Sequence, residues 1–249
     1  DKLHEIGEAY DNPLSIINAR ALKADYLVKS RNAHKVTEEA EQGISFSREK
    51  GTEFEEGHSM ATKAEAQQLS GNTEGAHDSI LQASEIYEKQ TSAVMPLFVA
   101  PYIAASLFVY VEQLKHAIRS ENFSEVANLR KRAYETGKAA VKNSKKYAPY
   151  RTKILRLMGL YYWLINKQSK ALRWWDKTIQ EGERLGARPD LSRTYFEVGK
   201  RLLESQSKHK ELNGIDPKGY LEKAETLFRE MNLERDLEDL GRLKAIHGF

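Results

Sequence analysis

Four short polar turns recur along the chain, and each runs into a small or β-branched residue. They occupy residues 31–36, 71–76, 121–126 and 166–171, so they return every 40 to 50 residues. Asn, Gly and Ser in such turns adopt left-handed backbone or cap a helix start, and the closing Ala or Val opens an apolar stripe. A period of this length is typical of repeat proteins, whose units bury a core by stacking on one another. We therefore expect a repeated array of helical hairpins.

The segments between the turns follow helical periodicity. Before the fourth turn, apolar and aromatic residues return every three or four positions, as on one face of a helix. They are Ile154, Leu157, Met158, Tyr161 and Tyr162. Gly and Pro are scarce, at 15 and 6 of 249 residues, and the composition favours good helix formers. The sequence predicts helices at 14–30, 33–50, 55–70, 73–90, 97–120, 123–146, 150–167, 169–186, 190–205, 218–231 and 233–246. The fold class is therefore all-α, with about five antiparallel helix pairs and a closing C-terminal helix in a single domain, 1–249.

The fourth unit resembles a tetratricopeptide repeat. Gly159 and Tyr162 match the small and aromatic positions of its first helix, and Ala171 and Trp175 match its second helix. Twelve residues separate Gly159 from Ala171, as that motif requires. The resemblance implies that a small residue at the helix crossing leaves a gap for a bulky one. It also implies a right-handed superhelical solenoid.

The fifth unit carries the same positions at Gly199, Ala224 and Phe228, but Gly199 and Ala224 are 25 residues apart. The excess falls in 205–219, a polar stretch that we interpret as a loop insertion. Such drawn-out units resemble the C-terminal helical repeats of large multidomain signalling ATPases, including those joined to nucleotide cyclase or kinase domains. Because the first residue is Asp1 and not Met, we expect a fragment of a longer protein.

Charge is divided unevenly along the chain. Residues 1–110 hold 10 Lys and Arg against 17 Asp and Glu, whereas residues 111–249 hold 29 against 19. Most of the excess lies in 115–210, with 23 basic and 9 acidic residues. Two interpretations remain open: solvated helix faces, or a binding surface for an anionic partner. Nucleic acid is the weaker partner class, because carboxylates are mingled with the cations and no nucleic-acid module is recognised.

The resemblance implies that the first helix of each pair lines a concave groove. In the fourth and fifth units this places Lys153, Arg156, Trp163, Arg193, Phe196 and Lys200 in the groove, with both arginines facing solvent. Cations mixed with apolar side chains suit a protein segment that carries carboxylates and an apolar anchor. We therefore expect a protein-protein interaction module of a signalling or regulatory protein. The alternative is a sensor that binds a small effector and regulates an attached ATPase, cyclase or kinase domain.

Motifs for catalysis or cofactor binding are missing from the sequence. No two of the seven histidines stand at helical i, i+3 or i+4 spacing, and there is no Cys. The segment 71–75 lacks the Lys-Ser/Thr of a phosphate-binding loop. We expect no enzyme activity, no metal and no nucleotide or other cofactor.

The run 94–111 is uncharged and mostly apolar, which raises the question of a membrane span. Pro96 and Pro101 lie in its first half and leave only 102–111 as an unbroken apolar helix, too short to cross a bilayer. We expect this helix to be buried in the core of a cytoplasmic protein without membrane contact.

Overall fold

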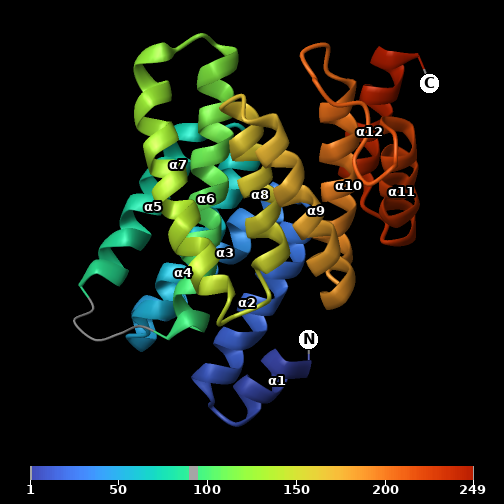
Figure 1. Cartoon of the computed structure of the whole chain (residues 1–249). Coiled ribbons are helices and arrows are strands. Elements are labelled where there is room, and N and C mark those ends of the chain that lie inside the picture. The colour runs from blue at the N-terminus through green and yellow to red at the C-terminus, as the bar shows by residue number, and fades with distance from the viewer. Residues whose placement is uncertain (1, 90–94, 249) are drawn as a thin grey trace. The chain divides into compact units, whose positions relative to one another are not determined.

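The computed structural model describes residues 2–89 and 95–248 (Figure 1). These residues form twelve helices joined by turns and irregular segments, and the only β-type pairing among them is an isolated bridge between Leu212 and Ile215. The helices are α1 (Lys2–Ala9), α2 (Pro13–Lys29), α3 (Ala33–Lys50), α4 (Glu53–Leu69), α5 (Thr73–Glu88), α6 (Pro96–Arg119), α7 (Phe123–Ser144), α8 (Arg151–Leu164), α9 (Gln168–Leu185), α10 (Arg188–Leu203), α11 (Pro217–Glu230) and α12 (Glu234–His247). The all-α class is confirmed.

The eleven expected helices correspond to α2 through α12, with ends that agree within about three residues. The short helix α1 was not expected from the sequence. It packs on α2 through Gly7, where an added Cβ would lie 2.6 Å from Ile16 Cγ1. Most of the stretch between the helices expected at 73–90 and 97–120 lies outside the described residues.

The turns between paired helices contain left-handed backbone, although in two of them the residue that adopts it is not the expected Asn, Gly or Ser. Arg31, Gly71, Glu121 and Asn166, the first residues of the four recurring segments, all have positive φ, between 53° and 86°. In the first two turns an Asn side chain then caps the next helix, and the Asn72 Oδ1 atom accepts from Gly75 N at 3.0 Å. Each chain reversal is therefore specified locally.

Helices adjacent in sequence pack on one another. Pairs form between α2 and α3, α4 and α5, α8 and α9, and α10 and α11, and α3 packs on α4 as α9 does on α10. The chain divides into two compact units, residues 1–113 and 114–249, with the boundary inside α6.

The crossing of α8 and α9 is built as the sequence motif predicted. Gly159 faces the Trp175 indole so closely that an added Cβ would lie 2.2 Å from its Nε1 atom. Trp175 and Ala171 are fully buried, and the Trp175 Nε1–H donates to the Arg156 carbonyl at 3.2 Å. In the next pair Gly199 meets Leu221 in the same way.

The stretch that follows α10 is a loop, as expected, because α10 ends at Leu203 and α11 begins at Pro217. Gln168, at the start of α9, holds this loop through two backbone atoms. Its Nε2 donates to the Gln206 carbonyl at 2.9 Å, and its Oε1 accepts from Lys208 N at 2.8 Å. The insertion is thus tied to the preceding helix pair.

Helix α6 runs without interruption through Pro101, so the expectation that this proline would break the apolar run is wrong. Pro101 lies near the start of the helix, where it removes only one backbone hydrogen bond. By length and composition α6 is long and apolar enough to cross a membrane, and 56% of its most apolar window is buried inside the protein. Leu107, Val109 and Val111 are fully buried.

Candidate functional site

The six residues predicted to bind a partner all lie in the second unit. Lys153, Arg156 and Trp163 are on α8, Arg193, Phe196 and Lys200 are on α10, and these two helices contact each other. The residues are therefore placed on neighbouring first helices, as the repeat pattern required. Their individual environments differ from the expectation.

Arg156 and Arg193 do not face solvent, and that expectation is wrong. Their side chains are only 13% and 15% exposed. The Arg156 Nη2 atom lies 3.5 Å from Asp190 Oδ1, and Arg193 donates to both carboxylate oxygens of Asp236, at 3.1 and 2.7 Å. A guanidinium at this depth needs a carboxylate partner. Arg156 thus links α8 to the first turn of α10, and Arg193 links α10 to the first turn of α12.

The expectation that Trp163 lines an open groove is also wrong. Its side chain is 5% exposed and lies against Trp175, with ring centroids 5.7 Å apart. Its Nε1–H donates to Glu204 Oε2 at 2.8 Å. Nearby, Phe196 packs edge-on against Phe228, and the Lys200 ammonium lies 5.9 Å from the centre of the Phe196 ring. Trp163 and Phe196 therefore contribute to packing within their own helix pairs, and the Trp163–Glu204 hydrogen bond links α8 to the end of α10.

A charged network lies along α10 beyond these residues. Arg201 is 5% exposed and donates to Glu197 at 2.6 Å and to Glu204 at the end of the helix. Burial raises the pKa of Glu197, but the charges of Arg201, Lys200 and Lys115 outweigh it and lower the pKa to about 2. Glu197 is consequently held as a carboxylate. The network satisfies its own charges and offers no free cation to a partner.

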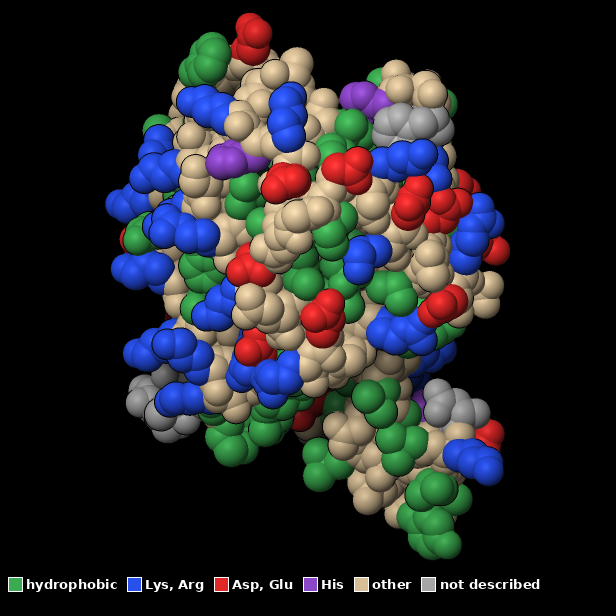
Figure 2. Space-filling view, turned by 45° about the vertical axis from the view of Figure 1, so that its right-hand side comes forward, with side chains coloured by type: hydrophobic (Ala, Val, Ile, Leu, Met, Phe, Trp, Pro, Cys, Tyr) green, Lys and Arg blue, Asp and Glu red, His purple; other side chains and the backbone are tan. Residues whose placement is uncertain are grey.

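Several cations that remain open to solvent line one face of α7. Lys131, Lys138, Lys142 and Lys145, the last at the C-cap, are all exposed and follow at steps of seven, four and three residues. At 3.6 residues per turn they fall within about 60° around the helix axis, and we call them the α7 lysine stripe. Figure 2 shows many Lys and Arg side chains along the left-hand side of its view.

Few carboxylates counter this stripe. Lys138 pairs with Glu135 at 3.4 Å, and both are well exposed. Among the described residues, Lys131, Lys142 and Lys145 form no ion pair with a carboxylate. The spacing of these lysines is present in the sequence, but the charge excess alone does not distinguish them from the cations that pair within the protein.

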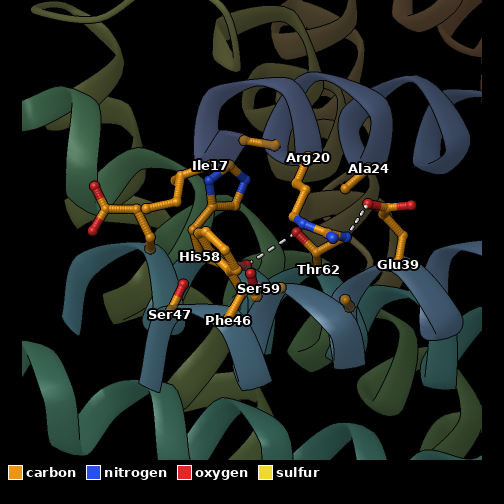
Figure 3. A pocket seen from close by; sticks show the side chains of 13 residues that line it. Ile17, Arg20, Ala24, Glu39, Phe46, Ser47, His58, Ser59 and Thr62 are labelled. Atoms are coloured by element: carbon orange, nitrogen blue, oxygen red, sulfur yellow. Dashed lines mark hydrogen bonds and ion pairs between the residues drawn. The ribbon is translucent and has the colours of Figure 1, made fainter. Parts of the chain in front are cut away.

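The first unit contains a narrow cavity of about 30 Å³ between α2, α3 and α4 (Figure 3). Arg20 extends into it from α2, and its Nη1 donates to Glu39 Oε1 at 3.1 Å and to Gln42 Oε1 at 3.0 Å. His58 enters from α4, with Nε2 3.8 Å from Asp25 Oδ1, too far for a hydrogen bond. No sequence motif marked these residues, because they come from three different helices.

Two polar atoms of this cavity lack partners among the described residues. Arg20 Nε and His58 Nε2 are both buried and form no hydrogen bond there. A volume of about 30 Å³ is close to that of one water molecule, so the cavity accepts a single small polar group. It does not accommodate a whole effector molecule.

Neither a protein-family model nor a curated protein matches this chain significantly. Among the described residues, no group of three or more His, Asp or Glu side chains lies close enough to hold a metal ion. The candidate sites are accordingly the α7 lysine stripe of the second unit and the small cavity of the first.

Proposed function

We propose that this chain is a tetratricopeptide-like interaction module that binds an acidic protein segment through the α7 lysine stripe. The single observation that carries the proposal is the alignment of Lys131, Lys138, Lys142 and Lys145 on one exposed face of α7. The repeat class and the right-handed sense of its superhelix belong to the same proposal. The repeat class is supported by the Gly159 and Trp175 contact and by consecutive pairing of the helices, whereas the right-handed sense follows from the tetratricopeptide resemblance alone.

Stabilisation of α7 itself does not account for the stripe. Cations near a helix C-terminus interact favourably with its dipole, but that effect fades within the last turn. Lys131 and Lys138 lie about two to four turns from the C-cap at Lys145. Like charges three or four residues apart also destabilise a helix slightly. An outside partner that neutralises the lysines explains their alignment better.

The dimensions of the stripe suit a short polypeptide. Lys131 and Lys145 are fourteen residues apart, about 21 Å along the axis. An extended chain of about six or seven residues covers this distance. Several carboxylates on such a segment can pair with the lysines, which steer its approach and set its register.

Nucleic acid is the weaker choice of partner for the same surface. Proteins that bind single strands combine cations with aromatic rings on which bases stack. The exposed aromatic residue beside the stripe, Tyr134, already stacks on Tyr161 with centroids 6.1 Å apart and carries the Lys138 ammonium 5.5 Å from its ring centre. Its faces are therefore engaged within the protein.

The sensor alternative has one observation in its favour, the two unpartnered nitrogen atoms of Arg20 and His58. The cavity that holds these atoms, about 30 Å³, is too small for effectors such as nucleotides, which need several hundred cubic ångströms. A hollow of about 540 Å³ lined by α3, α4 and α5 is large enough, but it does not contain the two unpartnered nitrogen atoms. The interaction module is therefore the function that the geometry supports best.

The test compares two triple variants of equal charge. Replacing Lys131, Lys138 and Lys142 by Gln preserves helix propensity and removes three cations from the stripe. The control replaces Lys208, Lys210 and Lys218 by Gln, three exposed lysines of the same unit. Fluorescence anisotropy with a labelled Glu-rich peptide should show roughly tenfold weaker binding for the stripe variant, from about 0.5 kcal/mol for each lost contact, and little change for the control.

Equal affinities of the two variants would contradict the proposal, as would the absence of peptide binding by the wild type. Single-stranded and duplex DNA of the same net charge serve as competitors. If DNA binds more tightly than the peptide and depends on the same lysines, the surface is a nucleic-acid interface and the proposed partner class is wrong.

A further inference from the structure

The N-terminal helices of the first unit expose an unusual amount of apolar surface. Ile6, Tyr10, Leu14, Leu22 and Tyr26 are 50% to 80% exposed. Figure 2 shows hydrophobic side chains gathered over these helices at the lower end of its view. Single exposed apolar side chains are ordinary, whereas a contiguous group of this kind marks an interaction surface.

On α2 these side chains form a ridge. Leu14, Asn18, Leu22 and Tyr26 follow at four-residue steps and are all exposed, and we call them the α2 ridge. The opposite side of the helix is already used, because Ile17, Ala24 and Leu27 are buried where α2 packs on α3 and α4. Helix α2 is thus apolar on two sides, and a globular helix of that kind is normally covered on both.

The charges at the two ends of α2 indicate what covers the ridge. Exposed Asp11 stands beside the N-terminal end of α2, and exposed Lys29 lies at its C-terminal end, whereas Glu8 and Lys23 already pair with His4 and Glu39 of the same chain. A second α2 lying antiparallel brings each acidic end beside a basic end and also opposes the two helix dipoles. A parallel arrangement would place like charges together. The surface is therefore complementary to itself under two-fold rotation, as a closed dimer requires.

We propose that two copies of this chain associate through their α2 ridges in an antiparallel, two-fold symmetric dimer. Near the symmetry axis Leu22 of each copy packs against the middle of the other ridge, and Leu14 lies opposite Tyr26. If the helices cross at a shallow angle of about 20°, Asp11 of one copy lies near Lys29 of the other. The proposal is independent of the α7 lysine stripe.

Sedimentation velocity across a concentration series tests the contact. Wild type should pass from monomer to dimer, and Leu22→Glu should raise the dissociation constant at least about tenfold by placing a charge at the centre of an apolar interface. The control is Leu81→Glu, because Leu81 is 43% exposed on α5 of the same unit and should leave the dimer unchanged. Circular dichroism establishes that both variants fold.

A charge exchange tests the antiparallel arrangement. Asp11→Lys and Lys29→Glu should each weaken the dimer, and the double variant should recover affinity. Within one chain these residues stand at opposite ends of α2, about 27 Å apart, so recovery reports a contact between copies. Three results would overturn the proposal: wild type monomeric at all concentrations, a dimer insensitive to Leu22→Glu, or no recovery in the double variant. Monomeric protein that binds lipid vesicles through Leu22 would instead identify a membrane surface.

Discussion

The contact between Gly159 and Trp175 shows how one residue fixes the geometry of a helix pair. Gly159 has no side chain, so the indole of Trp175 occupies the space where a Cβ would stand. Trp175 is fully buried, and its Nε1–H is satisfied by the Arg156 carbonyl. The resemblance of this unit to a tetratricopeptide repeat implied such a contact, because that motif places a small residue opposite a bulky one where its two helices cross.

The replacement Gly159→Ala should therefore destabilise the protein. The added methyl overpacks a full core, which costs about 1–3 kcal/mol and outweighs the gain in helix propensity of about 1 kcal/mol. Gly241→Ala is the matched control, because Gly241 lies inside α12 with no atom within 4 Å of its added Cβ. Urea unfolding should show a loss for the first variant and a small gain for the second. Equal stability of the two variants would show that α8 and α9 leave room for a methyl group at Gly159.

At the scale of elements, α10 shows what sequence periodicity reveals and what it misses. The sequence predicted α10 within about two residues and identified Arg193 and Lys200 as cations on its surface. It did not reveal that Arg193 binds Asp236, since the two residues are 43 positions apart and meet only through packing of α10 on α12. The mistaken solvent exposure of Arg156 has the same cause, with Asp190 34 positions away.

The charged network on α10 should make the stability of the fold depend on pH in the acidic range. Burial raises the pKa of Glu197, but Arg201, Lys200 and Lys115 lower it to about 2, against 4.5 for an unperturbed group. A lowered pKa stabilises the fold above pH 4.5, and this contribution disappears as the pH falls from 4.5 toward 2. The loss follows from protonation of a carboxylate that the folded protein holds ionised.

Glu197→Gln should therefore lower stability at pH 7 and flatten the decline between pH 4.5 and 2. Glu222→Gln, at an exposed position on α11, is the control and should retain the wild-type profile. Thermal melts across this pH range measure both effects. If the loss of stability between pH 4.5 and 2 were the same in wild type and Glu197→Gln, other carboxylates would be its cause.

At the scale of the whole molecule, the repeat pattern predicted α2 through α12 and their pairing, because turns and apolar stripes are local properties. Helix α1 escaped notice, since its contact with α2 depends on the close approach of Gly7 to Ile16. The grouping of the helices into two compact units, with a boundary inside α6, has no marker in the sequence. Likewise, the sequence showed an excess of cations, but only the structure separates the paired ones from those of the α7 lysine stripe.

The salt dependence of peptide binding tests the α7 lysine stripe most directly. The distance over which exposed charges act falls from about 30 Å at 0.01 M salt to about 3 Å at 1 M. The affinity of the wild type for the Glu-rich peptide should therefore fall steeply with salt, and the variant lacking the charges of Lys131, Lys138 and Lys142 should show a clearly shallower slope. A wild-type affinity that is constant across this range, or identical slopes for the two proteins, would contradict the account.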